Sequence, residues 1–411
     1  MIEPASSESI FMGGDSTHLR PATSAPIAVH TSFSGEDLYG IVCDYAALGH
    51  HRSGTDRGLA TVEWIKELVG DLGAVTAETV SFERYDVSSE LTADGRPIDH
   101  LALYYEFTGD IDTFDVAIRR LDPQSGGYPG VADALIDETR RAGHEALVIT
   151  TDHMEGDLVA INRDLAGPAS GLPTVLVAGR HHDTLASSTV RLRLSARLTA
   201  GRTANVEVHN ERPGRRLVLT TPLHGWFEAA GERGTGIAVL RYVAERLADR
   251  PLTIVATGGH ELGYLGAFRW VERCVDRGVE PPACVVHLGA SVAVESLAAD
   301  GSRRLIGSRI GMTNLPEAAA RSVADALDSA GIGLRYDVDS WLGEGEAWSR
   351  LAVPVLSTTG AGPDFHTPSD TPERATSPDA LATVAGSMAR AAATFHDAVL
   401  GGAGLARPVL D

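Results

Sequence analysis

Residues 217–236 read L-V-L-T-T-P-L-H-G-W-F-E-A-A-G-E-R-G-T-G, and residues 252–263 read L-T-I-V-A-T-G-G-H-E-L-G. Each segment opens with a short apolar run that predicts a β-strand, and ionisable residues follow it. Between the two runs, residues 234–247 place apolar side chains at helical spacing. In open α/β sheets, ligands bind beyond the carboxyl ends of the strands. The ionisable residues after both runs are therefore predicted to face one crevice.

The alternation of strand and helix continues to the end of the chain. Further strands are predicted at residues 205–208, 284–288 and 353–356, and further helices at residues 58–72, 263–274, 315–330 and 378–399. Strands that alternate with helices of this length predict an α/β fold with a mostly parallel central sheet, flanked by helices in three layers.

Residues 112–204 have a different pattern from the rest of the chain. A predicted helix leads into a strand there, and a long segment of alternating apolar and polar residues follows. We expect a small inserted α/β domain at 112–204, a main domain formed by 41–111 and 205–411, and an irregular N-terminal extension at 1–40.

Composition excludes several classes of partner. The 411 residues carry 55 acidic against 35 basic side chains, a formal net charge of -20, which argues against nucleic acid and anionic membranes. No apolar run approaches the ~18 residues of a membrane span, and the N-terminus shows no signal-peptide pattern. Three cysteines without paired spacing favour a reduced, cytoplasmic protein. The apolar face of residues 378–399 is either core or the surface of a homodimer.

Four ionisable residues suit a metal ion by their chemistry. His224, Glu232, Glu261 and His366 offer two imidazoles and two carboxylates, each shortly after a predicted strand. Imidazole and carboxylate both donate well to Zn²⁺ or a similar divalent ion. By spacing alone, the same residues are equally compatible with polar loop positions in an acidic protein.

The order of motifs resembles the M28 family of zinc aminopeptidases and its glutaminyl-cyclase relatives. The matching motifs are His224, E-R-G-T-G at 232–236, H-E-L-G at 260–263 and, most specific of all, D-F-H-T-P at 364–368. G-H-H-R-S-G-T at 49–55 and W-S-R-L-A-V-P at 348–354 extend the likeness, and 112–204 is similar to a protease-associated domain. The resemblance implies a zinc-exopeptidase-like fold, with Glu232, Glu261, His366 and His224 as metal ligands.

The chain departs from the family pattern at five positions. His260 stands where the family has its general base, a Glu, and Glu232 stands where it has a bridging Asp. Gly289 replaces an Asp ligand. Trp226 replaces the Asp that orients the first metal-binding His, and Phe365 replaces a Tyr whose hydroxyl often helps to hold the oxyanion. One metal site, formed by Glu232, Glu261 and His366, therefore keeps its ligands, so one zinc ion is expected rather than two.

The resemblance also assigns roles around this site. His260, with an unperturbed pKa of ~6.5, would accept the proton of the attacking water. His287 is either a substitute ligand or a residue that faces the substrate or the core. Arg233 either pairs with a substrate carboxylate or is held by Asp364 or Glu228, and Glu344 either binds a substrate amine or is solvated. With these, the residues expected to contact substrate are Trp226, Arg233, His287, Glu344, Asp364 and Phe365.

The function that follows is a metal-dependent hydrolase of amide bonds in a small molecule or short peptide. Because the base, one Asp and the Tyr are altered, standard aminopeptidase activity is not implied. Two alternatives remain: a metal-dependent cyclase, lyase or transferase on the same fold, and a non-catalytic binding protein. Retention of Glu261 and His366 together favours catalysis.

Overall fold

The computed structural model describes residues 33–121, 130–151, 153, 155–276, 278 and 280–403, which all belong to one compact unit. Most of the predicted N-terminal extension lies outside these residues. Its last part is a helix, because α1 (Gly35–Ala47) begins within it. Ser34 caps this helix, its hydroxyl accepting from the Asp37 backbone N–H while the Asp37 carboxylate accepts from the Ser34 backbone N–H. This capping box is a local helix-start signal that overrides the irregular composition before it.

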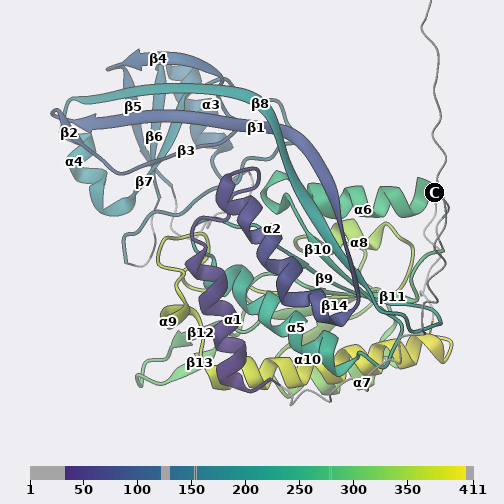
Figure 1. The fold of residues 1–411 in the computed structure, drawn as a ribbon. Coiled ribbons are helices and arrows are strands. Elements are labelled where there is room, and N and C mark those ends of the chain that lie inside the picture. The colour runs from purple at the N-terminus through teal and green to yellow at the C-terminus, as the bar shows by residue number, and fades with distance from the viewer. Residues whose placement is uncertain are drawn as a thin grey trace, which may run out of the picture. The chain divides into compact units, whose positions relative to one another are not determined.

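The centre of the molecule is a sheet of ten strands among the described residues (Figure 1). Four parallel strands form its middle, in the order β10 (Leu252–Thr257), β9 (Leu217–Pro222), β11 (Cys284–Leu288) and β16 (Val355–Thr359). The mostly parallel arrangement expected from the sequence is confirmed for these strands.

The outer strands make the sheet mixed. On one side, β14 (Ile310–Thr313) pairs antiparallel with β16 and parallel with β15 (Gly333–Arg335). On the other, β8 (Val190–His209) pairs antiparallel with β10, β1 (Ala74–Ala93) and β4 (Gly109–Thr113), and β1 with β2 (Arg96–Pro97). The β1 and β8 pairing extends over the full 20 residues of both strands.

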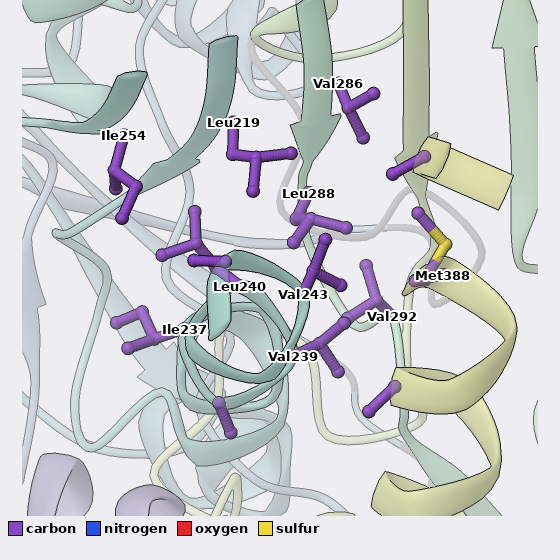
Figure 2. Packing of buried hydrophobic residues seen from close by; sticks show 14 of the residues in the cluster. Leu219, Ile237, Val239, Leu240, Val243, Ile254, Val286, Leu288, Val292 and Met388 are labelled. Atoms are coloured by element: carbon purple, nitrogen blue, oxygen red, sulfur yellow. The ribbon is translucent and has the colours of Figure 1, made fainter. Parts of the chain in front are cut away.

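Alternation along the middle strands separates two hydrophobic cores. Leu217 and Leu219 point into the core beneath α1, α2 (Asp56–Val69), α5 (Thr235–Arg246), α7 (Glu317–Asp328) and α10 (Pro378–Leu400), whereas Val218 points to the core with α6 (Leu265–Asp276) and α8 (Gly345–Ser349). Period-two side chains place neighbouring residues on opposite faces, so both faces are covered. Figure 2 shows part of the first core, with Leu219, Ile254 and Val286 on strands and Val239, Leu240 and Val243 on α5.

Helix α10 contributes its apolar face to this core. Val384, Met388 and Phe395 are fully buried there. The sequence left open whether the apolar face of residues 378–399 is core or the surface of a homodimer. These three side chains belong to the core. No helix in the described part of the chain has the length and apolarity needed to cross a bilayer.

A second, four-stranded sheet takes three of its strands from the region predicted as the insert, 112–204, and the fourth, β3, from the residues before it. Its order is β3 (Leu101–Ala102), β7 (Thr174–Ala178), β6 (Ala146–Thr151) and β5 (Val116–Arg120), with α3 (Asp133–Ala142) and α4 (His182–Ala186) alongside. Side chains of β1 and β8 share a core with β6 and β7. These two long strands therefore take part in both regions (Figure 1). The remaining elements are β12 (Glu295–Leu297), β13 (Arg303–Leu305), α9 (Pro372–Ala375), the single turns Gly70–Leu72, Gly179–His181 and His260–Leu262, and the π-helical turn Ala230–Gly234.

Candidate functional site

A cavity of about 470 Å³ lies beyond the carboxyl ends of β9, β10, β11 and β16. The ionisable residues that line it are Arg163, Asp164, Arg233, His260, Glu261, Tyr264, His287, Glu344 and His366, and Trp341, Leu342 and Phe365 are among its other lining residues. The crevice predicted from the two strand ends is therefore present. Its volume is typical of a pocket for a small molecule.

A buried ion pair adjoins the cavity through Arg233. The π-helical turn Ala230–Gly234 carries Glu232 and Arg233, whose side chains are each 1% exposed, and joins Glu232 Oε1 to Arg233 Nη2 at 2.6 Å. Arg233 Nε also donates to the His224 carbonyl oxygen at 2.8 Å. The sequence suggested Asp364 or Glu228 as a partner that holds Arg233. The observed partner is Glu232, the preceding residue in the chain.

Asp370 fixes this turn from the opposite side. Its carboxylate accepts from the backbone N–H groups of Gly231 at 2.7 Å and of Glu232 at 3.0 Å. Burial raises the pKa of Asp370 to about 7, although these N–H groups act in the other direction. Sequence reasoning missed Asp370, even though it belongs to the S-D-T triplet directly after the motif at 364–368.

His366 reaches the same carboxylate oxygen from another loop. Its Nε2 lies 3.2 Å from Glu232 Oε1, and its Nδ1 lies 3.0 Å from the Ala160 carbonyl oxygen. The Ala160 backbone N–H in turn donates to the His366 carbonyl at 2.8 Å. His366 has a φ of 61°, which non-glycine residues rarely adopt and which often marks functional positions. Burial opposes ionisation of Glu232, yet Arg233 and His366 together lower its pKa to about 2.

His260 and Glu344 form a second pair at the cavity. His260 Nδ1 lies 3.0 Å from Glu344 Oε2, and the Thr257 hydroxyl donates to Glu344 Oε1 at 2.6 Å. Glu344 is buried, so the solvated reading of this residue is wrong. Burial, assisted by Arg233, places the pKa of His260 well below its ordinary value. The imidazole is therefore neutral at physiological pH.

Several polar atoms of the site are buried without a hydrogen-bond partner among the described residues. They are Glu232 Oε2, Arg233 Nη1, Glu261 Oε1 and His287 Nδ1. Burial raises the pKa of Glu261 to about 7, and its other oxygen accepts from the Ser53 hydroxyl at 3.2 Å. Burial lowers the pKa of His287 to about 4. Buried polar groups are normally paired, so this concentration of orphans indicates a ligand site.

Four of the predicted site residues do not line the cavity, namely Glu232, His224, Trp226 and Asp364. Both ring nitrogens of His224 meet the backbone, Nδ1 accepting from Gly259 N–H at 3.3 Å and Nε2 lying 3.2 Å from the Gly58 carbonyl. Trp226 Nε1 donates to Asn162 Oδ1 at 2.7 Å, and Asp364 pairs with Arg374 at 2.9 Å. Of the other residues expected to contact substrate, Arg233, His287, Glu344 and Phe365 line the cavity, and Phe365 stacks on His366.

Comparison with known proteins identifies the fold. No protein-family model matches the chain, and no curated protein sequence does so either. Among solved structures, the zinc aminopeptidase BSAP of Bacillus subtilis matches with a TM-score of 0.68 at 16% identity, over 87% of this chain and 94% of that one. An M28 peptidase precursor of Shewanella amazonensis SB2B gives a TM-score of 0.67 at 17% identity, over 91% and 95% of the two chains.

A third solved structure gives the same result. The aminopeptidase of Aneurinibacillus sp. strain AM-1 matches with a TM-score of 0.58 at 17% identity, over 92% of this chain and 96% of that one. The fold of this protein is therefore the α/β fold of the M28-type zinc aminopeptidases, with a central sheet flanked by helices.

The residues of this chain, as arranged, do not fit the zinc ion of those enzymes. Glu232 already carries a guanidinium and an imidazole on one oxygen, and both nitrogens of His224 are directed to backbone groups. At Gly289, where the family has an Asp, a Cβ atom would lie 2.9 Å from the Thr358 carbonyl oxygen. Within the described ranges, no group of three or more His, Cys, Asp or Glu side chains is placed to hold a metal ion.

Proposed function

We propose that this protein hydrolyses an amide bond in a small molecule or short peptide within the 470 Å³ cavity. The observation that carries the proposal is the convergence of three kinds of group on that cavity. His260 is anchored by a carboxylate, Glu261 is a half-buried residue with one buried carboxylate oxygen, and Arg233 is a buried guanidinium. The peptidase fold supports the same class of reaction, as does the family resemblance of the motifs.

Each group has a role in this hydrolysis. With Nδ1 of His260 engaged by Glu344, Nε2 is left to accept a proton from water, whose oxygen then attacks the carbonyl carbon. Arg233 donates to the carbonyl oxygen, which becomes negative as the tetrahedral intermediate forms. Glu261 gives a proton to the nitrogen as the C–N bond breaks, so the products are a carboxylic acid and an amine.

A single zinc ion, which the sequence analysis led us to expect on Glu232, Glu261 and His366, has no step in this proposal. The reason is positional, since the guanidinium of Arg233 takes up the carboxylate oxygen that the ion would need. Standard aminopeptidase chemistry, in which zinc activates the water, is therefore not assigned to this chain.

A panel of aminoacyl and N-acyl p-nitroanilides and short peptides, assayed by product release, tests the proposal. His260→Ala and Glu261→Gln should each lower kcat by about 100-fold or more. Glu346→Gln is the matched control, because Glu346 is an exposed carboxylate two residues after Glu344 and pairs with Arg350. Turnover that survives both substitutions would remove the assigned roles. Ligand binding without turnover of any amide would favour the non-catalytic alternative.

A further inference from the structure

The site holds a fixed cation of its own. Arg233 is among the largest fully buried side chains of the described residues, yet it lines the cavity. Its Nε and Nη2 are bonded to the His224 carbonyl and to Glu232, which fixes the plane of the guanidinium. Its Nη1 has no partner in the described part of the chain. A buried, oriented and unpaired donor of this kind indicates an oxygen acceptor on a bound ligand.

The cation lies where three potential metal donors meet. Glu232 Oε1 contacts both Arg233 Nη2 and His366 Nε2, so the oxygen and the imidazole are held in one hydrogen-bonded group. The fold places Glu232, Glu261 and His366 where the family resemblance expects an ion. A divalent ion among them would stand next to a buried guanidinium, and two like charges in a buried site repel strongly.

We propose that the guanidinium of Arg233 takes the place of the metal ion, so that the site is metal-independent and presents Nη1 to a carbonyl or carboxylate oxygen of its ligand. Charge supports this assignment. Glu232 neutralises one positive charge, as it would partly neutralise an ion. Unlike an ion, the guanidinium offers N–H donors in fixed directions and does not ionise a bound water.

The position of Arg233 in the chain explains how the replacement is built. The guanidinium comes from the residue after Glu232, and the π-helical turn Ala230–Gly234 brings both side chains to the same side. Regular helical spacing separates the directions of consecutive side chains, so the wider turn makes the pair possible. Two carboxylate atoms, Glu232 Oε2 and Glu261 Oε1, stay without partners among the described residues. These oxygens become available to an ion once the guanidinium is removed.

Zinc binding by calorimetry and by elemental analysis tests this inference on the full chain. The unmodified protein, dialysed against zinc, should hold well under one ion per chain. Arg233→Ala and Arg233→Met should each bind about one zinc, with affinity raised by about 100-fold or more, because a buried repulsion is gone. Arg233→Met keeps the apolar stem, so it guards against a failure of Arg233→Ala to fold.

Two further variants make the result specific. Arg233→Met combined with His366→Ala should lose the zinc again. Arg241→Ala is the control. Arg241 is another buried arginine, which lies on α5 and pairs with Asp71 and with Glu245, and its removal should not create a zinc site.

One zinc per unmodified chain that is lost in His366→Ala would overturn the inference. Failure of both Arg233 variants to gain zinc would overturn it as well, since the guanidinium would then not be what fills the ion's place. This experiment measures bound zinc, whereas the test of the hydrolase proposal measures turnover. Either proposal can therefore fail without the other.

Discussion

The pair of His260 and Glu344 shows what a single residue can and cannot reveal before folding. The motif at 260–263 predicts His260 at a strand end, and the structure places it at the cavity. Glu344 lies 84 residues further on, in a segment without strand or helix periodicity. Whether Glu344 meets His260 depends on the path of the loop before α8. The pairing of these two residues was therefore not predictable from their spacing in the sequence.

Glu344→Gln should lower turnover while leaving the fold intact. The amide is similar in size and still accepts from Thr257, but it removes the carboxylate that fixes which nitrogen of His260 carries the proton. A buried carboxylate-to-amide change beside a histidine base should cost about 100-fold or more in kcat, with little change in KM. Steady-state kinetics on the best amide substrate would show this, together with an altered pH profile. An unchanged kcat would leave Glu344 a structural residue.

Between elements, one arginine of α6 ties two neighbouring strands together. Arg273 forms an ion pair with Glu207 of β8 and another with Glu78 of β1, at 2.8 Å. Helix α6 and the last part of β8 were foreseen from periodicity, at residues 263–274 and 205–208. Which helix lies over which strand was not, because it is set by the crossover connections of the sheet and not by the local pattern.

The ion pair of Glu207 should make stability depend on pH. Burial opposes ionisation, but His209, Trp270 and Arg273 outweigh it and lower the pKa of Glu207 to about 2 from an ordinary value of 4.5. A carboxyl with a depressed folded-state pKa adds stability above the unfolded-state pKa and loses it as pH falls through the folded one.

Glu207→Gln should therefore reduce the free energy of unfolding by about 2 kcal/mol at pH 7. The difference from the unmodified protein should shrink between about pH 4.5 and pH 2. Urea titrations at a series of pH values measure it. A difference that is constant with pH would show that packing, and not ionisation, carries the effect.

For the whole molecule, the open question is whether the two sheets unfold together. The described residues form one compact unit, and β1 and β8 contribute to the cores of both regions. All five tryptophans, Trp64, Trp226, Trp270, Trp341 and Trp348, lie outside residues 112–204. Tryptophan fluorescence therefore reports chiefly on the main region, with Trp226, which donates to Asn162, the one exception among the five.

Val148→Ala in β6 and Leu219→Ala in β9 test this cooperativity, because both side chains are fully buried. Leu219→Ala should cost about 2–5 kcal/mol through the cavity it leaves, and Val148→Ala somewhat less. If the long strands couple the regions, each variant should shift one common transition, seen alike by fluorescence and far-ultraviolet circular dichroism. A Val148→Ala variant with an unshifted fluorescence transition would instead support an independent insert at 112–204.

The sequence by itself determined the alternation of strands and helices from β9 to α10, because hydrophobic period and turn residues are local properties. It also determined that ionisable groups cluster beyond the strand ends. Only the tertiary structure decided that Arg233 holds Glu232, that His224 turns both nitrogens to the backbone, and that Asp370 fixes the turn between them. The last two involve partners up to 166 residues apart, and all three sets of contacts depend on how the loops beyond the strand ends meet, which no local propensity encodes.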